Sequence, residues 1–238
     1  MGVAHHSGTR DPIAILIDDD DAVRDALEEL LNSVGIESVS FSSAQEFLDA
    51  TPPDRPSCII LDVRMPGLSG LDLQQMLAGK GVFIPIVFLT GHGDIAMSVQ
   101  AMKAGAVDFL TKPVRDQTIL DAVSAAIAAD VARRAVSTES TKSSALYETL
   151  TTRERQVLHL VIAGAVNKKI AFELGISEIT VKLHRSNMMR KMGSSSITQL
   201  YSVWQSLPAD IRALPIEDVA AVARRIAAPS VVRLPSPI

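Results

Sequence analysis

The chain has one cysteine, no long hydrophobic run and, in its first half, few basic residues. Cys58 is the single cysteine among 238 residues, so no internal disulfide can form. This cysteine content is typical of proteins in a reducing compartment. No apolar stretch approaches the roughly 20 residues that span a bilayer, so no membrane segment is expected. Residues 1–12 lack the hydrophobic core of a secretory signal, which predicts a cytoplasmic location.

The scarcity of basic residues in the first half marks a division of charge. Residues 11–130 contain 7 lysines and arginines against 19 aspartates and glutamates, a net charge of −12. Residues 150–200 contain 8 basic and 3 acidic residues, a net charge of +5. The first segment should therefore repel nucleic acid and the second should attract it, which predicts two modules with different partners.

Short apolar strands alternate with helical patterns between residues 11 and 130, which we call the front module. Apolar residues from Val23 to Val34 recur at helical spacing, and Gly35 follows as a helix stop. This alternation predicts a doubly wound α/β fold with a parallel sheet. Strands are expected at 13–18, 37–41, 57–62, 84–90 and 107–110.

The pattern changes after residue 130. A helix near 117–134 leads into the Ser/Thr-rich run 136–144, whose low apolar content is typical of a linker. A surface loop inside one domain is the alternative, and the reversal of charge across the run disfavours it. We therefore expect a first domain at 11–130, a helix extension and linker at 131–147, and a second domain at 148–206. A tail follows at 207–238, with a possible helix at 216–227.

Residues 148–206, the rear module, show only helical patterns. Thr151 and Glu154 form a capping-box start of the first helix. Gly175 separates the second helix from the third, which Ser177 can cap. Two short helices joined by a tight glycine turn form a helix-turn-helix pattern, although many helical bundles share it. The second, third and fourth helices are expected at 167–174, 178–192 and 197–205.

Polar residues of the front module stand where its strands end. Asp18 and Asp19, the first of four consecutive aspartates, follow the first strand, and Asp62 follows the third. Thr90 ends the fourth strand, and Lys112 follows the fifth. The carboxyl ends of adjacent parallel strands line one crevice, and adjacent carboxylates are costly unless a cation lies among them. Three acids, a hydroxyl and a lysine predict a site for Mg²⁺ and a phosphoryl group.

Four motifs carry a resemblance to a known family. They are Asp18-Asp19, Leu61-Asp62-Val63-Arg64-Met65-Pro66-Gly67, Thr90-Gly91-His92-Gly93-Asp94 and Lys112-Pro113. Together they resemble the receiver domain of two-component response regulators, and the stretch 90–109 is similar to the FixJ branch in particular. The resemblance covers about residues 11–130 and implies a flavodoxin-like, five-stranded parallel sheet of order 2-1-3-4-5.

The resemblance implies a role for each residue of the crevice. Asp62 would accept a phosphoryl group from a sensor histidine kinase, and Lys112 would bond the phosphate. Asp19, Asp62 and the backbone carbonyl of Arg64 would hold Mg²⁺, with Asp18 acting largely through bound water. Mg²⁺-dependent autodephosphorylation would be the only reaction that the chain catalyses.

The resemblance also implies a switch. Phosphorylation adds about −1.5 to −2 charges and three acceptor oxygens, toward which the Thr90 hydroxyl would move. Phe109 would then turn inward and reshape the face formed by the fourth helix, fifth strand and fifth helix. Pro113 would follow a cis peptide bond, as in the family, whereas His92 is expected to be an exposed loop residue.

The rear module resembles the LuxR-type DNA-binding domain through residues 150–154, 167–171, 174–185 and 188–192. Both modules together are similar to response regulators of the FixJ/NarL type. A helix at 178–192 would then lie in the major groove of double-stranded DNA. Its base-facing residues would be Lys182, Leu183 and Ser186, and the phosphate contacts would be Thr180, His184, Arg185, Arg190, Lys191, Lys168 and Lys169.

We therefore expect a transcription regulator that binds DNA as a homodimer when phosphorylated and activates transcription with RNA polymerase as partner. An aspartyl-phosphate phosphatase or phosphotransferase is a second possibility, but such enzymes usually carry an aspartate where this chain has Arg64. RNA or protein binding is a third, which the helix 182–191 disfavours because it lacks aromatic residues for stacking.

Overall fold

A computed structural model describes residues 11–91 and 94–214. The chain divides into two compact units between Arg134 and Ala135. Within the described ranges, no helix combines the length and the apolar character that crossing a membrane requires. His92 and the helix predicted at 216–227 lie outside the described residues.

The first unit is built on a five-stranded parallel sheet of order β2-β1-β3-β4-β5, as predicted. Ile17 pairs with Leu61 at the carboxyl ends of β1 and β3. The next residues along the two strands, Asp18 and Asp62, therefore leave the sheet at the same level. The strands are β1 (Ile13–Ile17), β2 (Glu37–Phe41), β3 (Ser57–Leu61), β4 (Ile86–Thr90) and β5 (Asp108–Thr111).

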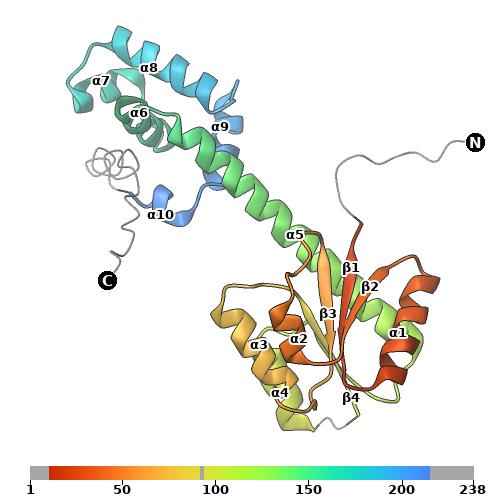
Figure 1. Cartoon of the computed structure of the whole chain (residues 1–238). Coiled ribbons are helices and arrows are strands. Elements are labelled where there is room, and N and C mark those ends of the chain that lie inside the picture. Colours follow the sequence, from red (N-terminus) through yellow and green to blue (C-terminus); the bar gives the residue numbers. More distant parts are fainter. Residues whose placement is uncertain (1–10, 92–93, 215–238) are drawn as a thin grey trace, which may run out of the picture. The chain divides into compact units, whose positions relative to one another are not determined.

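Helices cover both faces of this sheet (Figure 1). On one face α2 (Ala44–Asp49), α3 (Gly70–Gly79) and α4 (Ile95–Lys103) pack against the sheet. On the other face lie α1 (Asp21–Ser33) and the first part of α5 (Asp116–Glu148). Successive strand residues point to opposite faces, so each strand supplies both cores. Cys58 is buried in the second of these cores, as its apolar run predicts.

The Ser/Thr-rich run 136–144, which the sequence predicts as a linker, is helical in the structure because α5 continues to Glu148. The run contains no glycine or proline, so nothing in it interrupts helical hydrogen bonding. Ser143 is buried and its hydroxyl hydrogen-bonds to Ser206 at 2.6 Å. Tyr147 belongs to the core of the second unit, which therefore begins before residue 148. The predicted domain limits remain predictions.

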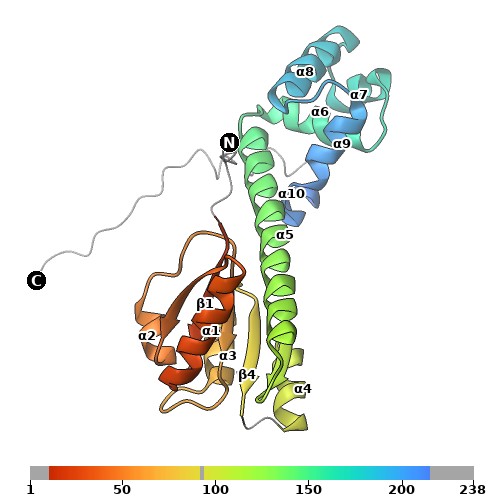
Figure 2. The same ribbon diagram turned by 90° about the vertical axis from the view of Figure 1, so that its right-hand side faces the viewer.

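The second unit is a helical bundle in both ribbon views (Figures 1 and 2). Thr151 begins its first helix with a capping box, and Ser177 caps α8 by accepting from the Thr180 amide at 3.1 Å. Gly175 ends α7 with φ +64°, a left-handed conformation that favours glycine. The helices are α6 (Thr152–Ile162), α7 (Asn167–Leu174), α8 (Glu178–Lys191), α9 (Ile197–Gln205) and α10 (Ala209–Arg212), the last without a counterpart in the prediction.

Candidate functional site

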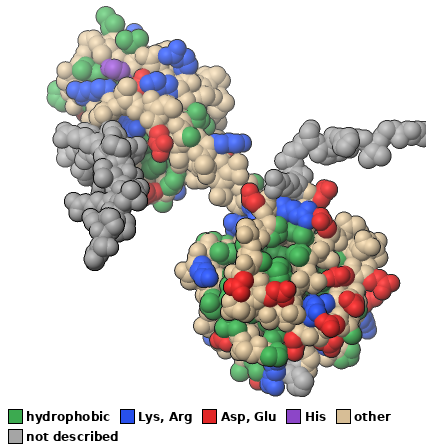
Figure 3. Space-filling model, viewed as in Figure 1, with side chains coloured by type: hydrophobic (Ala, Val, Ile, Leu, Met, Phe, Trp, Pro, Cys, Tyr) green, Lys and Arg blue, Asp and Glu red, His purple; other side chains and the backbone are tan. Residues whose placement is uncertain are grey.

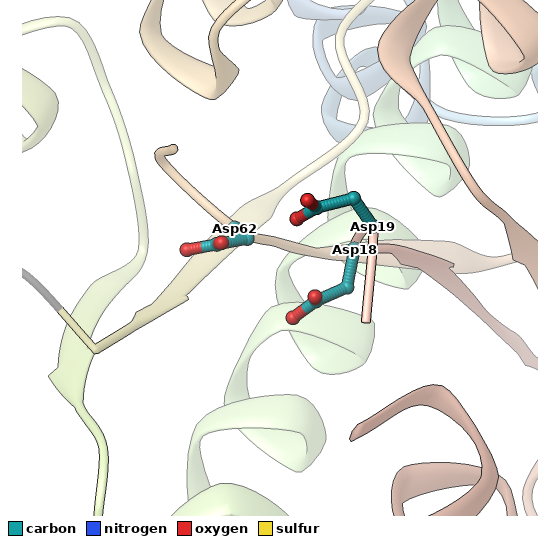
Figure 4. A group of neighbouring side chains, drawn as sticks. All are labelled: Asp18, Asp19 and Asp62. Atoms are coloured by element: carbon teal, nitrogen blue, oxygen red, sulfur yellow. The ribbon is translucent and has the colours of Figure 1, made fainter. Parts of the chain in front are cut away.

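Three carboxylates meet at the carboxyl ends of β1 and β3. Oxygen atoms of Asp18, Asp19 and Asp62 all lie within 4.8 Å of one another. Figure 4 shows the three side chains projecting to the same side of the strand ends. Asp18 is buried and Asp19 is exposed, so the group opens to solvent on one side. The structure thus brings together the acids that the sequence predicts as a metal and phosphoryl site.

Asp18 is held in place by positive and polar partners. Its Oδ2 accepts from Lys112 Nζ at 2.6 Å, and its Oδ1 accepts from the Asp20 amide at 3.0 Å. Arg24 donates to the Asp18 carbonyl at 2.5 Å and also pairs with Asp21. Arg24 could not be identified from the sequence, because an arginine one turn into a helix is not part of any recognisable motif.

The remaining predicted residues of this site lie on or directly after β4 and β5. Thr90 is buried at the end of β4, and its carbonyl accepts from the Lys112 amide at 2.9 Å. The Lys112–Pro113 peptide bond is cis, as predicted. Phe109 on β5 is half-buried, and its ring centre lies 5.9 Å from that of Phe88. A backbone hydrogen bond therefore links the two residues that carry the predicted hydroxyl and ammonium groups, and Phe109 packs next to β4.

Gly70 is a further residue of this site that the sequence reasoning missed. It begins α3 where the helix approaches the loop that carries Asp62, and its amide donates to the Val63 carbonyl at 3.0 Å. A Cβ atom on Gly70 would lie 2.2 Å from the Asp62 carbonyl oxygen. Only glycine fits this close approach, and no local sequence pattern reveals a contact across eight residues.

The donor set of the site suits a hard cation. Mg²⁺ prefers oxygen ligands and usually takes one or two carboxylates together with water. Asp18, Asp19 and Asp62 supply carboxylate oxygens only, with one side open to water. A receiver domain generally binds Mg²⁺ at such an acidic pocket, and the residues present here fit that ion. The predicted contribution of the Arg64 carbonyl remains a prediction.

The predicted DNA-contacting helix, α8, has two distinct faces. Val181, Met188 and the following Met192 are fully buried in the core. Lys182, Leu183 and Ser186 are exposed, so the residues predicted to face bases are all free of the core. Figure 3 shows lysine and arginine side chains on the visible face of this unit and many acidic side chains on that of the first.

Several predicted phosphate contacts already have partners inside the rear module. Lys191 Nζ lies 2.7 Å from Glu154 Oε2 and donates to the Thr149 carbonyl at 3.0 Å. Arg185 donates to Asn167 Oδ1 at 3.1 Å. These lysine and arginine side chains therefore have structural roles that compete with contact to phosphate. The Thr180 hydroxyl bonds to the capping Ser177, and His184 is half-buried. The other predicted phosphate contacts are exposed: Lys168, Lys169 and Arg190.

These contacts favour the charged form of Glu154. Burial raises the pKa of this carboxyl, but hydrogen bonds from Lys191 and Thr151 outweigh burial and hold the pKa below its ordinary value. His159, also on α6, packs against Trp204 with ring centres 4.8 Å apart, and burial lowers its pKa. This packing gives His159 a structural role in the core of the rear module.

Comparison with known proteins agrees with this arrangement. Residues 14–124 match the response regulator receiver domain, and residues 148–204 match the luxR family of bacterial regulatory proteins. Nodulation protein W of Bradyrhizobium diazoefficiens is 49% identical over 203 residues, which cover 85% of this chain and 89% of that protein. The chain belongs to the two-component response regulators with a LuxR-type DNA-binding domain.

Two further relatives are similar to this response regulator over most of its length. The transcriptional regulatory protein FixJ of Azorhizobium caulinodans is 43% identical over 185 residues, covering 78% of this chain and 88% of that protein. The solved structure of the response regulator StyR matches with a TM-score of 0.75 and 44% identity, covering 82% of this chain and 99% of that one. The protein is thus a transcriptional response regulator rather than a typical enzyme, and a histidine kinase and DNA are its implied partners.

Proposed function

We propose that Asp62 accepts a phosphoryl group from a sensor histidine kinase, and that the phosphorylated protein binds DNA as a homodimer and activates transcription. The observation that supports Asp62 is its carboxylate at the end of β3, within 4.8 Å of the oxygens of Asp18 and Asp19. A single carboxylate at a strand end is common, whereas three that converge beside Lys112 suit phosphoryl transfer.

Asp19, Asp62 and the Arg64 carbonyl would hold Mg²⁺, and Asp18 would act largely through a bound water. When bound, the ion offsets the repulsion between an incoming phosphoryl group and the carboxylates. Lys112, now paired with Asp18, would donate to a phosphate oxygen and add a second positive charge.

The transfer exchanges one bond for another. An Asp62 carboxylate oxygen attacks the phosphorus of the kinase's phosphohistidine, a P–O bond forms, and the P–N bond breaks to return the histidine. In autodephosphorylation a water oxygen attacks the same phosphorus and releases inorganic phosphate. Asp62 is regenerated as a carboxylate, so the chain ends each cycle unchanged.

Phosphorylation would act on the rest of the receiver through Thr90 and Phe109. The new phosphate oxygens accept a hydrogen bond from the Thr90 hydroxyl, and Phe109 turns into the space that Thr90 leaves. Phe109 is on the edge strand β5, with its ring centre 5.9 Å from that of Phe88, and a rotation there would change the face made by α4, β5 and α5. We infer that the receivers of two phosphorylated chains then pair.

The rear module would place α8 in the major groove, with Lys182, Leu183 and Ser186 facing bases. Lys168, Lys169 and Arg190, which are exposed, are the stronger candidates for phosphate contacts. Thr180, His184, Arg185 and Lys191 are weaker candidates, because each is partly buried. RNA polymerase would then be recruited to the bound dimer.

Labelling with radioactive acetyl phosphate tests the phosphoacceptor. Asp62→Asn should abolish incorporation, because the amide is a far weaker nucleophile than the carboxylate. Asp20→Asn is the matched control: Asp20 stands in the same acidic run but caps α1 through the Ala22 amide, so this variant should retain labelling. Undiminished labelling of Asp62→Asn would contradict the assignment.

A further inference from the structure

Two large apolar side chains lie on the exposed face of α8. Ile179 is 80% exposed and Leu183 is 60% exposed. They are four positions apart, so they lie one above the other on the helix surface. The opposite face of α8 supplies Val181 and Met188 to the core, where both are fully buried. The exposed pair is therefore outside the core and open to an external surface.

The residues around this pair indicate the chemistry of the surface that covers it. Lys182 and Ser186 lie beside the pair and are exposed. Residues 150–200 carry a net charge of +5, so the partner should be anionic and should also offer apolar groups. The major groove of DNA combines these properties, because phosphates border it and the C5-methyl group of thymine is the apolar group exposed there.

We propose that Ile179 and Leu183 contact thymine methyl groups, so that Ile179 determines sequence specificity together with Lys182, Leu183 and Ser186. The inference rests on the proposed position of α8 in the major groove. Four residues span about 6 Å of helix at about 1.5 Å per residue, and base pairs are about 3.4 Å apart. The two methyl groups should therefore lie about two base pairs apart in each half-site.

Selection of DNA from a random pool begins the test. Full-length protein treated with beryllofluoride is incubated with random double-stranded DNA, and the bound molecules are amplified and sequenced. Thymines should be enriched at two positions about two base pairs apart in each half-site. Each thymine is then replaced by uracil, which lacks only the methyl group. Loss of one buried methyl group should raise the Kd about fourfold.

Alanine variants then identify the side chain that contacts each methyl group. Ile179→Ala should bind the selected DNA about fourfold or more weakly and should no longer distinguish thymine from uracil at one of the two positions. Leu183→Ala should lose the distinction at the other position. Phe172→Ala is the matched control, because Phe172 is 88% exposed but lies on α7, and its thymine-to-uracil ratio should stay that of the wild type.

The outcomes separate this inference from the function on which it depends. An Ile179→Ala variant with the full thymine-to-uracil ratio at both positions would overturn the role of Ile179. Selected DNA whose affinity is unchanged by uracil would overturn the inference while leaving α8 as the DNA-binding helix. If no sequence is enriched at all, the proposed DNA-binding function fails together with the inference.

Discussion

At the scale of the residue, Gly70 shows that the site needs a residue without a Cβ atom at the start of α3. The glycine lets α3 begin against the loop of Asp62, where a Cβ atom would come within 2.2 Å of a carbonyl oxygen. That oxygen belongs to the residue that we propose as the phosphoacceptor. A larger residue must therefore either shift α3 or displace Asp62 from the neighbouring carboxylates.

Gly70→Ala should destabilise the front module by about 1–3 kcal/mol and slow labelling by acetyl phosphate, because the backbone contact cannot relax freely. Urea unfolding followed by circular dichroism, together with labelling rates, measures both effects. Gly79→Ala is the control: it changes the same helix where a new Cβ meets nothing within 4 Å, and should be neutral or stabilising by up to about 1 kcal/mol. Equal behaviour of the two variants would contradict this role of Gly70.

Glu154 is the second residue whose surroundings decide its behaviour. Its folded-state pKa lies below the ordinary value, since Lys191 and Thr151 favour the charged carboxylate despite burial. A lowered pKa means that the unfolded chain binds a proton first as the pH falls. The stabilisation is therefore present above about pH 4.3, the ordinary glutamate value, and is lost as the pH falls through the lower, folded value.

Glu154→Gln should lower the stability of the rear module at pH 7 by about 1–3 kcal/mol, because Lys191 loses its charged partner. The difference from the wild type should shrink as the pH falls below the ordinary glutamate value and through the lower, folded value, where the wild-type carboxyl also becomes neutral. Trp204, the single tryptophan of the chain, is buried in the rear core, so its fluorescence during urea unfolding reports this module. A difference that stays constant with pH would argue against the ion pair.

At the scale of the element, α5 is fixed to the sheet by a buried carboxylate. Asp130 is fully buried and accepts from the Ser57 amide at the start of β3 at 3.0 Å. Arg133 and Arg134 on the next turn of α5 donate to the same carboxylate, and Arg134 also pairs with Asp54. Burial raises the pKa of Asp130, but hydrogen bonds from these arginines and Ser57 outweigh it and hold the pKa below its ordinary value.

Asp130→Ala should destabilise the front module by about 3 kcal/mol, because it leaves the buried Ser57 amide without an acceptor and two arginines without their partner. Asp121→Ala, in the same helix but exposed and bonded to the exposed Gln117, should change the free energy of unfolding by less than about 0.5 kcal/mol. Circular dichroism measures the whole chain, and Trp204 fluorescence should show an unchanged rear module in both variants.

Most elements follow from local patterns in the sequence. Each predicted strand lies within two residues of the observed one at either end, and α7 and α9 have the predicted bounds. These patterns are strong because they combine apolar periodicity with glycine stops and capping residues such as Ser177. The run 136–144 was misjudged because serine and threonine are neutral enough in helices for tertiary contacts, such as that of Ser143, to decide.

At the scale of the whole molecule, opposite charges divide the chain into two kinds of surface. The net charge of −12 over residues 11–130 and of +5 over residues 150–200 suits DNA binding by the rear module alone. Binding to DNA by one such module covers little surface, so the proposed dimer would provide the affinity for paired half-sites. A shift of the receiver from 1% to 99% in the conformation that pairs would require a differential stabilisation of about 5.5 kcal/mol.

Sedimentation of the full chain with and without beryllofluoride should show a shift from monomer to dimer, because the mimic of the phosphoryl group favours receiver pairing. Asp62→Asn should remain monomeric under both conditions, since the mimic requires the carboxylate. A wild-type mass that does not change would count against phosphate-driven pairing, while leaving the labelling of Asp62 as a separate question.

The sequence alone determined the two modules, the order of their elements and the acids at the strand ends, because periodicity, capping and strand-end motifs act locally. The resemblance to the LuxR-type domain indicated Lys182, Leu183 and Ser186 as base-facing residues, and the structure shows them exposed. Only the tertiary structure decided which charges are already engaged, such as Lys191 with Glu154, and where backbone excludes a side chain, as at Gly70. Those contacts join residues from different elements, and their distances depend on how the elements pack.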